Sequence, residues 1–122
     1  MNVKTVALTA LLLGLSAGAA FAQQVTPRPG AVSIVTTGGT AVTAVPGPSN
    51  GCYIINPLST ADQGVSPAEP LYVDPTTAAT TAGNATNTAI APGQPWFCVP
   101  NSTVSVSVNA ASSGHKYTVV RW

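Results

Sequence analysis

Short runs of β-prone residues, each closed within a few positions by Pro, Gly or Asn, dominate the chain after residue 30. Val, Ile, Thr and aromatic residues fill these runs, and such residues favour strands. The chain has 11 prolines, nearly all between the runs, where they suit turns and sheet edges better than central strands. The regular spacing of turn residues between short β-prone runs predicts a small all-β architecture.

The individual strands can be predicted from periodicity. Val alternates with Ser over residues 103–109, which gives a strand with one apolar face and one polar face. Residues 115–122 carry apolar side chains on both faces, so we expect a central strand there. Gly38-Gly39 lies between two β-prone runs and predicts a hairpin. The remaining expected strands cover residues 31–35, 40–45, 52–56, 71–74, 88–91 and 96–99.

Seven or eight such strands predict a small antiparallel β-sandwich or a jelly-roll-like barrel. No long helix is expected after residue 22, although the loop at 57–70 has room for one helical turn. We divide the chain into a helical signal peptide at 1–22, a flexible lead-in at 23–30 and a single β-sandwich domain at 31–122.

The first 22 residues have the three parts of a secretory signal peptide. Lys4 gives a positive start, residues 6–15 are apolar, and residues 20–22 form an A-x-A cleavage motif. The apolar run is too short to cross a bilayer of about 30 Å as a helix. We therefore expect an exported protein that is periplasmic, cell-surface or extracellular, with no membrane span after cleavage of the signal.

Cys52 and Cys98 are the two cysteines of the sequence, and both lie in short apolar runs. An even pair of cysteines in an exported chain is typical of a structural disulfide. The sequence lacks both a C-x-x-C redox pair and a Cys/His spacing for zinc. We predict a Cys52–Cys98 bridge.

Charged residues are scarce after the predicted signal peptide. Arg28, Lys116 and Arg121 balance Asp62, Glu69 and Asp74, so the net charge is near zero. Soluble domains usually carry about a quarter of their residues as charges. The absence of a basic patch argues against nucleic acid binding, and low charge favours association with other copies or with another surface protein.

The same scarcity argues against an enzyme. A glycosidase needs two carboxylates flanking its substrate, and Asp62 and Glu69 are better explained as solvated loop residues. His115 follows Gly114 at the start of a strand, so we expect a turn or surface histidine rather than a pH-sensitive contact or a metal ligand. We predict no catalytic residue, no metal site and no cofactor.

Two functional hypotheses remain. The first is a non-enzymatic structural or assembly protein of the periplasm, cell surface or an extracellular structure, with Trp122 as a candidate assembly contact. The second is a secreted binding module for a carbohydrate, lipid or partner protein. It would use the 57–70 loop, in which Asp62, Gln63 and Glu69 are the candidate binding residues.

Overall fold

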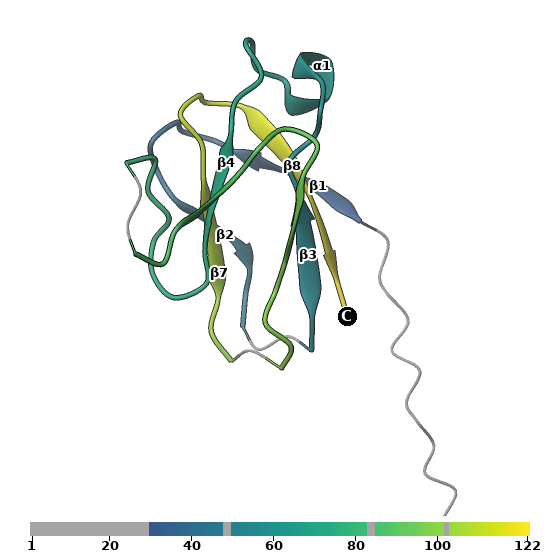
Figure 1. The fold of residues 1–122 in the computed structure, drawn as a ribbon, viewed down its shortest axis with the longest axis vertical. Helices are drawn as coiled ribbons and strands as arrows, with labels where there is room; N and C mark the ends of the chain where they lie inside the picture. Colours follow the sequence, from purple (N-terminus) through teal and green to yellow (C-terminus); the bar gives the residue numbers. More distant parts are fainter. Residues whose placement is uncertain (1–29, 48–49, 83–84, 102) are drawn as a thin grey trace, which may run out of the picture.

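Two four-stranded antiparallel sheets make up most of the computed structural model (Figure 1). The structure describes residues 30–47, 50–82, 85–101 and 103–122. The predicted signal peptide at 1–22 and residues 23–29 of the predicted lead-in lie outside the described residues. In the described part of the chain, the elements are β1 (Ala31–Val35), β2 (Val42–Val45), β3 (Cys52–Ile55), α1 (Thr60–Gln63), β4 (Leu71–Asp74), β5 (Thr88–Ile90), β6 (Pro95–Phe97), β7 (Val106–Asn109) and β8 (His115–Arg121).

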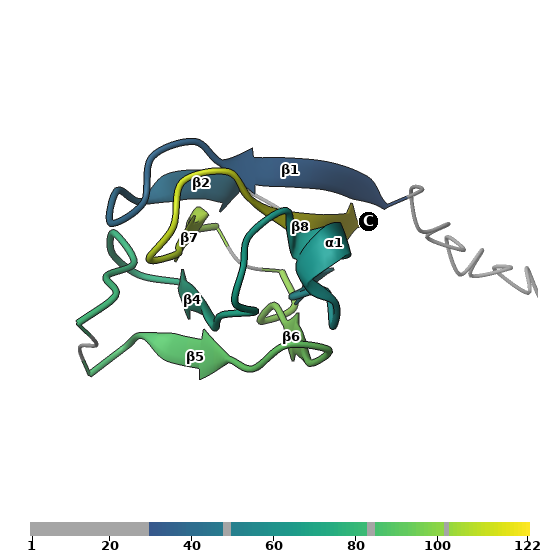
Figure 2. The ribbon, with the colours of Figure 1, turned by 90° about the horizontal axis from the view of Figure 1, so that it is seen from above.

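Each sheet contains four strands, and one of the last two strands of the chain lies at an inner position in each. Sheet A has the strand order β1-β8-β3-β6, and sheet B has the order β2-β7-β4-β5. Strand β8 is therefore an inner strand, as its two apolar faces predict. The helix α1 lies beside β8 at one end of the molecule (Figure 2). This arrangement confirms the predicted all-β, sandwich-like fold.

The core lies between the sheets, and the alternation in each strand determines which side chains enter it. Val106 and Val108 of β7 are buried, as the Val/Ser alternation predicts. Pairing in this strand begins only at Val106, and Val104 is 48% exposed. The fully buried apolar side chains of the core include Val35, Ile54, Leu71, Val73 and Val108.

The predicted hairpin at Gly38-Gly39 is wrong. β1 pairs with β8 in sheet A, whereas β2 pairs with β7 in sheet B, so the connection passes from one sheet to the other. Gly38 packs against the backbone of Ala111 so closely that a Cβ atom would overlap it. Gly38 thus permits a close approach between two inter-sheet connections, a non-local requirement that local turn chemistry does not reveal.

The Cys52–Cys98 disulfide is present, as predicted. Cys52 begins β3 and Cys98 follows β6, and their Cα atoms are 5.0 Å apart. The backbone N–H of Cys98 also donates to the carbonyl of Cys52 at 2.9 Å. Both side chains are buried in the core cluster, so the bridge joins two adjacent strands of sheet A within the apolar interior.

Asp74, at the end of β4, organises the loop that follows it. Its Oδ1 accepts hydrogen bonds from the backbone N–H groups of Thr76 and Thr77 at 2.8 Å and from the hydroxyl of Thr76 at 2.9 Å. Its Oδ2 accepts from the hydroxyls of Thr77 and Thr86. Burial raises the pKa of Asp74, but these five hydrogen bonds outweigh burial and hold the pKa far below its ordinary value.

Two side chains on the outer face of β7 hold the same loop against sheet B. The Ser107 hydroxyl donates to the Thr77 carbonyl at 2.6 Å and accepts from the N–H of Ala79 at 2.8 Å. The Asn109 amide donates to the Ala79 carbonyl at 2.9 Å. The Thr-rich segment after β4 is therefore an ordered loop that covers part of sheet B.

Replacing both cysteines with alanine should lower the free energy of unfolding by about 4 kcal/mol, because the bridge closes a loop with a sequence separation of 46 residues. Chemical denaturation of Cys52→Ala/Cys98→Ala beside the parent protein measures this difference. Free-thiol labelling of the unreduced, unfolded parent should find no reactive cysteine. Stoichiometric labelling would contradict the bridge.

Asp74→Asn should destabilise the fold by about 2–3 kcal/mol, because the amide removes the charge and presents a donor where the carboxylate accepts hydrogen bonds. Thermal or urea unfolding measures the loss. Asp62→Asn, at an exposed carboxylate, is the matched control and should change stability by less than about 0.5 kcal/mol. Equal effects of the two substitutions would contradict this account of Asp74.

Candidate functional site

A buried polar cluster holds both ends of the 57–70 loop. Asn56 precedes the loop, and its amide nitrogen donates to the carbonyl of Ile90 at 2.9 Å and to that of Glu69 at 3.0 Å. Gln63, in α1, donates to Asn56 Oδ1 at 3.0 Å and to the Pro57 carbonyl at 2.8 Å. The side-chain oxygen of Gln63 accepts from the backbone N–H of Glu69. These bonds orient both amide groups unambiguously.

His115 completes this cluster, and the prediction of a turn or surface histidine is wrong. Its side chain is fully buried, because it lies opposite Val35 on the inward face of sheet A. Nδ1 lies 3.0 Å from Glu69 Oε1, and Nε2 lies 3.0 Å from Asn56 Oδ1. Since both neighbouring oxygens are acceptors, the ring satisfies both only when it carries a proton on each nitrogen.

The Glu69 carboxylate is held by Ser112, in the loop between β7 and β8, and by His115, at the start of β8. Ser112 donates to it from its backbone N–H and from its hydroxyl, each at 2.9 Å. Burial raises the pKa of Glu69, but the hydrogen bonds from Ser112 and His115 and the positive charge of a protonated His115 bring it below its ordinary value of 4.5. Glu69 is therefore an ionised partner of His115 at neutral pH.

The three candidate binding residues of this loop point in different directions. Gln63 and Glu69 are turned into the buried cluster, and Asp62 is exposed. Asp62 Oδ2 accepts from the hydroxyl of Ser59, whose own oxygen caps the N-terminus of α1. Sequence reasoning missed Asn56 and Ser112, because nothing local indicates that their side chains meet Glu69 and His115.

The outer face of sheet A is unusually apolar, and sequence reasoning did not find it. Directly opposed residues of antiparallel strands share a face, so the register identifies its members. One row contains Val32, Thr118, Ile55 and Pro95, and a second contains Val120, Tyr53 and Phe97. We call this surface, together with Ile34 of β1 and Leu58 beside it, the sheet A face.

Several large apolar side chains of the sheet A face are open to solvent. Val32 is 68% exposed, Phe97 is 67% exposed and Leu58 is 73% exposed, and Ile34 is also exposed. Single exposed apolar residues are normal on proteins, whereas large contiguous apolar patches are typical of interaction sites. The run Ala31–Val35 contains the only sequence signal, since its apolar residues occupy both faces of the strand.

Trp122 lies at the margin of the sheet A face and contacts Asn50 and Gly51 of the same chain. Its carbonyl accepts from the N–H groups of Asn50 and Gly51, and its ring lies so close to Gly51 that a Cβ there would be only 2.5 Å away. Its ring centroid is 6.3 Å from that of Tyr53, which is 6.1 Å from that of Phe97. The tryptophan thus extends an aromatic cluster.

A hollow lies at the α1 end of the sheet A face. Val32, Ile55, Leu58 and Thr118 line it together with the oppositely charged Asp62 and Lys116. The hollow has a volume of about 520 Å³. It therefore combines an apolar floor with one acidic and one basic group in its lining.

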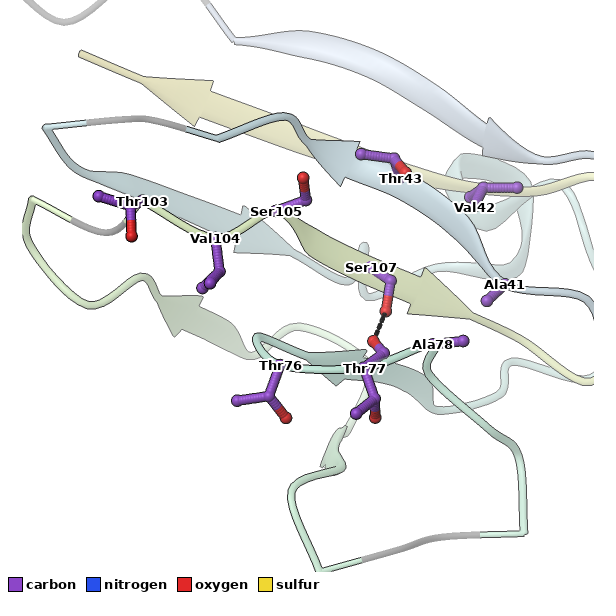
Figure 3. Close-up of a pocket in the computed structure, with 10 residues that line it drawn as sticks. All are labelled: Ala41, Val42, Thr43, Thr76, Thr77, Ala78, Thr103, Val104, Ser105 and Ser107. Atoms are coloured by element: carbon purple, nitrogen blue, oxygen red, sulfur yellow. Dashed lines mark hydrogen bonds between the residues drawn. The ribbon is translucent and has the colours of Figure 1, made fainter.

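A second groove lies over sheet B, between β2, β7 and the loop after β4 (Figure 3). Hydroxyl side chains line much of it, including Thr43, Thr76, Thr103 and Ser105. Ser107 is engaged with Thr77, and the Ser105 hydroxyl accepts from the N–H of Gly47 at 3.3 Å. Part of its polar lining is thus used within the fold, which makes this groove the weaker candidate site.

The described residues contain no cluster of three or more His, Cys, Asp or Glu side chains that could hold a metal ion. In the same part of the chain, no helix is long and apolar enough to span a membrane. Comparison with models of known protein families, with curated proteins and with solved structures found no match for the chain. Its function is therefore inferred from the geometry.

Glu69→Gln should lower the free energy of unfolding by about 2 kcal/mol at pH 7, because it removes the charged partner of His115 and Ser112. The folded pKa of Glu69 is depressed, so its ionised form contributes stability above its ordinary value of 4.5. That contribution is lost as the pH falls below 4.5 and the carboxylate is protonated. Urea unfolding of both proteins from pH 7 to pH 3 should show the difference shrinking.

Asp74 titrates equally in both proteins and cancels in this comparison. A difference between parent and Glu69→Gln that stays constant over the whole range would contradict the role assigned to the Glu69 charge.

Proposed function

We propose that the protein is exported and acts as a non-enzymatic structural or assembly protein of the periplasm, the cell surface or an extracellular structure. The observation that carries this proposal is the exposed apolar surface of the sheet A face, where Val32, Phe97 and Leu58 are each more than half exposed. Burial of such side chains against another protein is favourable, since apolar surface leaves water. The sheet A face is the proposed contact.

The chemistry of the titratable groups supports a role without catalysis. His115 is fully buried between two acceptors, and Asp74 is saturated by hydrogen bonds from three threonines. A general acid or base must reach the proton that it transfers. Glu69, the partner of His115, is likewise engaged by Ser112, so these groups hold loops in place.

The Cys52–Cys98 disulfide supports export, because such bonds persist in oxidising compartments. Together with the A-x-A motif at residues 20–22, it favours the periplasm, the cell surface or the exterior. The alternative function, a binding module that uses the 57–70 loop, has less support. Of its three candidate residues, Gln63 and Glu69 are directed into the fold.

A benzophenone cross-linker placed at position 97 should form covalent protein adducts when cells exporting the protein are irradiated, because Phe97 is exposed within the proposed contact. Position 43 is the control, since Thr43 is exposed on sheet B. Electrophoresis followed by peptide mapping measures the adduct yield at positions 97 and 43. Adding Val32→Asp should abolish the adduct from position 97. Equal yields at positions 97 and 43, or none at 97, would contradict the proposed function.

A further inference from the structure

The strongest unassigned feature is the combination of shape and charge at the α1 end of the sheet A face. Leu58 projects into solvent there, with 73% of its surface exposed, and the hollow lies directly beside it. A projection and a hollow on one surface can each receive the other when a second copy is related by a two-fold axis. Such isologous contacts need a surface that is complementary to itself.

The charges on the sheet A face meet the same requirement. Asp62 and Lys116 line the same hollow and carry opposite charges. Arg121 is exposed but belongs to the inward-facing row of β8, alternating with Val120. A two-fold axis that sets the two hollows against each other in opposite directions would bring Asp62 of each copy toward Lys116 of the other. The face is thus neutral in sum and complementary to its own copy, whereas a strongly charged partner would find no matching patch.

The size of the face limits the area that such a contact can bury. Four strands about 4.8 Å apart and on average about 16 Å long give a footprint of roughly 20 Å by 16 Å. Stable specific interfaces bury about 800 Å² per partner. A footprint of about 300 Å², enlarged by Leu58 and its hollow, is below that value, so the contact is expected to be weak and reversible.

We propose that the sheet A face is a homodimer interface in which Leu58 of each copy inserts into the hollow of the other, flanked by two symmetric Asp62–Lys116 pairs. This inference rests on the proposed function and makes it specific, because it names a second copy of the chain as the partner. The exposed strand β1, which carries Val32 and Ile34, lies within the buried area.

Sedimentation equilibrium of the purified protein from about 1 µM to 1 mM should show a reversible monomer–dimer equilibrium. Val32→Asp should weaken the dimer by about tenfold or more, since it places a charge in the apolar contact. Val104→Asp, on the sheet B side, is the matched control and should leave the equilibrium unchanged. Thermal unfolding verifies that each variant is folded.

Reversing the charge of Asp62 or of Lys116 tests whether the partner is a second copy of the chain. Asp62→Lys alone or Lys116→Asp alone should each weaken self-association by roughly tenfold, because both symmetric pairs become repulsive. A mixture of the two single variants should restore association as a heterodimer, since every pair across its interface is then attractive. Such rescue requires both variants to be folded and requires a second copy as partner.

Three outcomes would overturn the inference. They are a monomer at every concentration, a dimer that Val32→Asp leaves intact, and single variants that do not rescue each other. A monomer in solution that still gives position-97 adducts with a different protein overturns the homodimer alone, whereas adducts with a lipid or glycan alone also contradict the proposed function. Absence of position-97 adducts contradicts the proposed function itself.

Discussion

The hydrogen bonds that His115 makes to Glu69 and Asn56 are the constraint on which the candidate surface depends. Asn56 and Glu69 stand at the two ends of the 57–70 loop, so one buried ring holds the whole loop against β8. Gln63 fixes its middle from the same cluster. With these inner residues held, Leu58 and Asp62 must face outward, where they border the hollow beside the sheet A face.

The few charges of this chain are divided between interior and surface. Asp74 and Glu69 are used to hold loops, one over sheet B and one at the end of the sandwich. Among the described residues, Asp62, Lys116 and Arg121 are left for the surface. Buried carboxylates satisfied by several donors fix local geometry, and little repulsion remains outside to keep copies of the protein apart.

The strands and the disulfide were predictable because local patterns determine them. Alternation identified the inward positions of β7, and the two apolar faces of 115–122 identified an inner strand. The predicted hairpin at Gly38-Gly39 and the predicted surface position of His115 were wrong, and the inward orientation of Gln63 and Glu69 was not foreseen. Each depends on which strands pair across the fold, and pairing joins residues far apart in sequence, such as Val35 with His115. The sheet A face was missed for the same reason, since Val32, Ile55 and Phe97 come together only through register.

The strand order also determines when the molecule can fold. β7 and β8, the last two strands in chain order, are inner strands of sheet B and sheet A respectively. During synthesis from the N-terminus, the neighbouring pairs β3–β6 and β4–β5 can form early, but β1 and β2 have no partner until the final strands emerge. Completion of both sheets, and with it cooperative folding of this domain, thus waits until β7 and β8 have been synthesised.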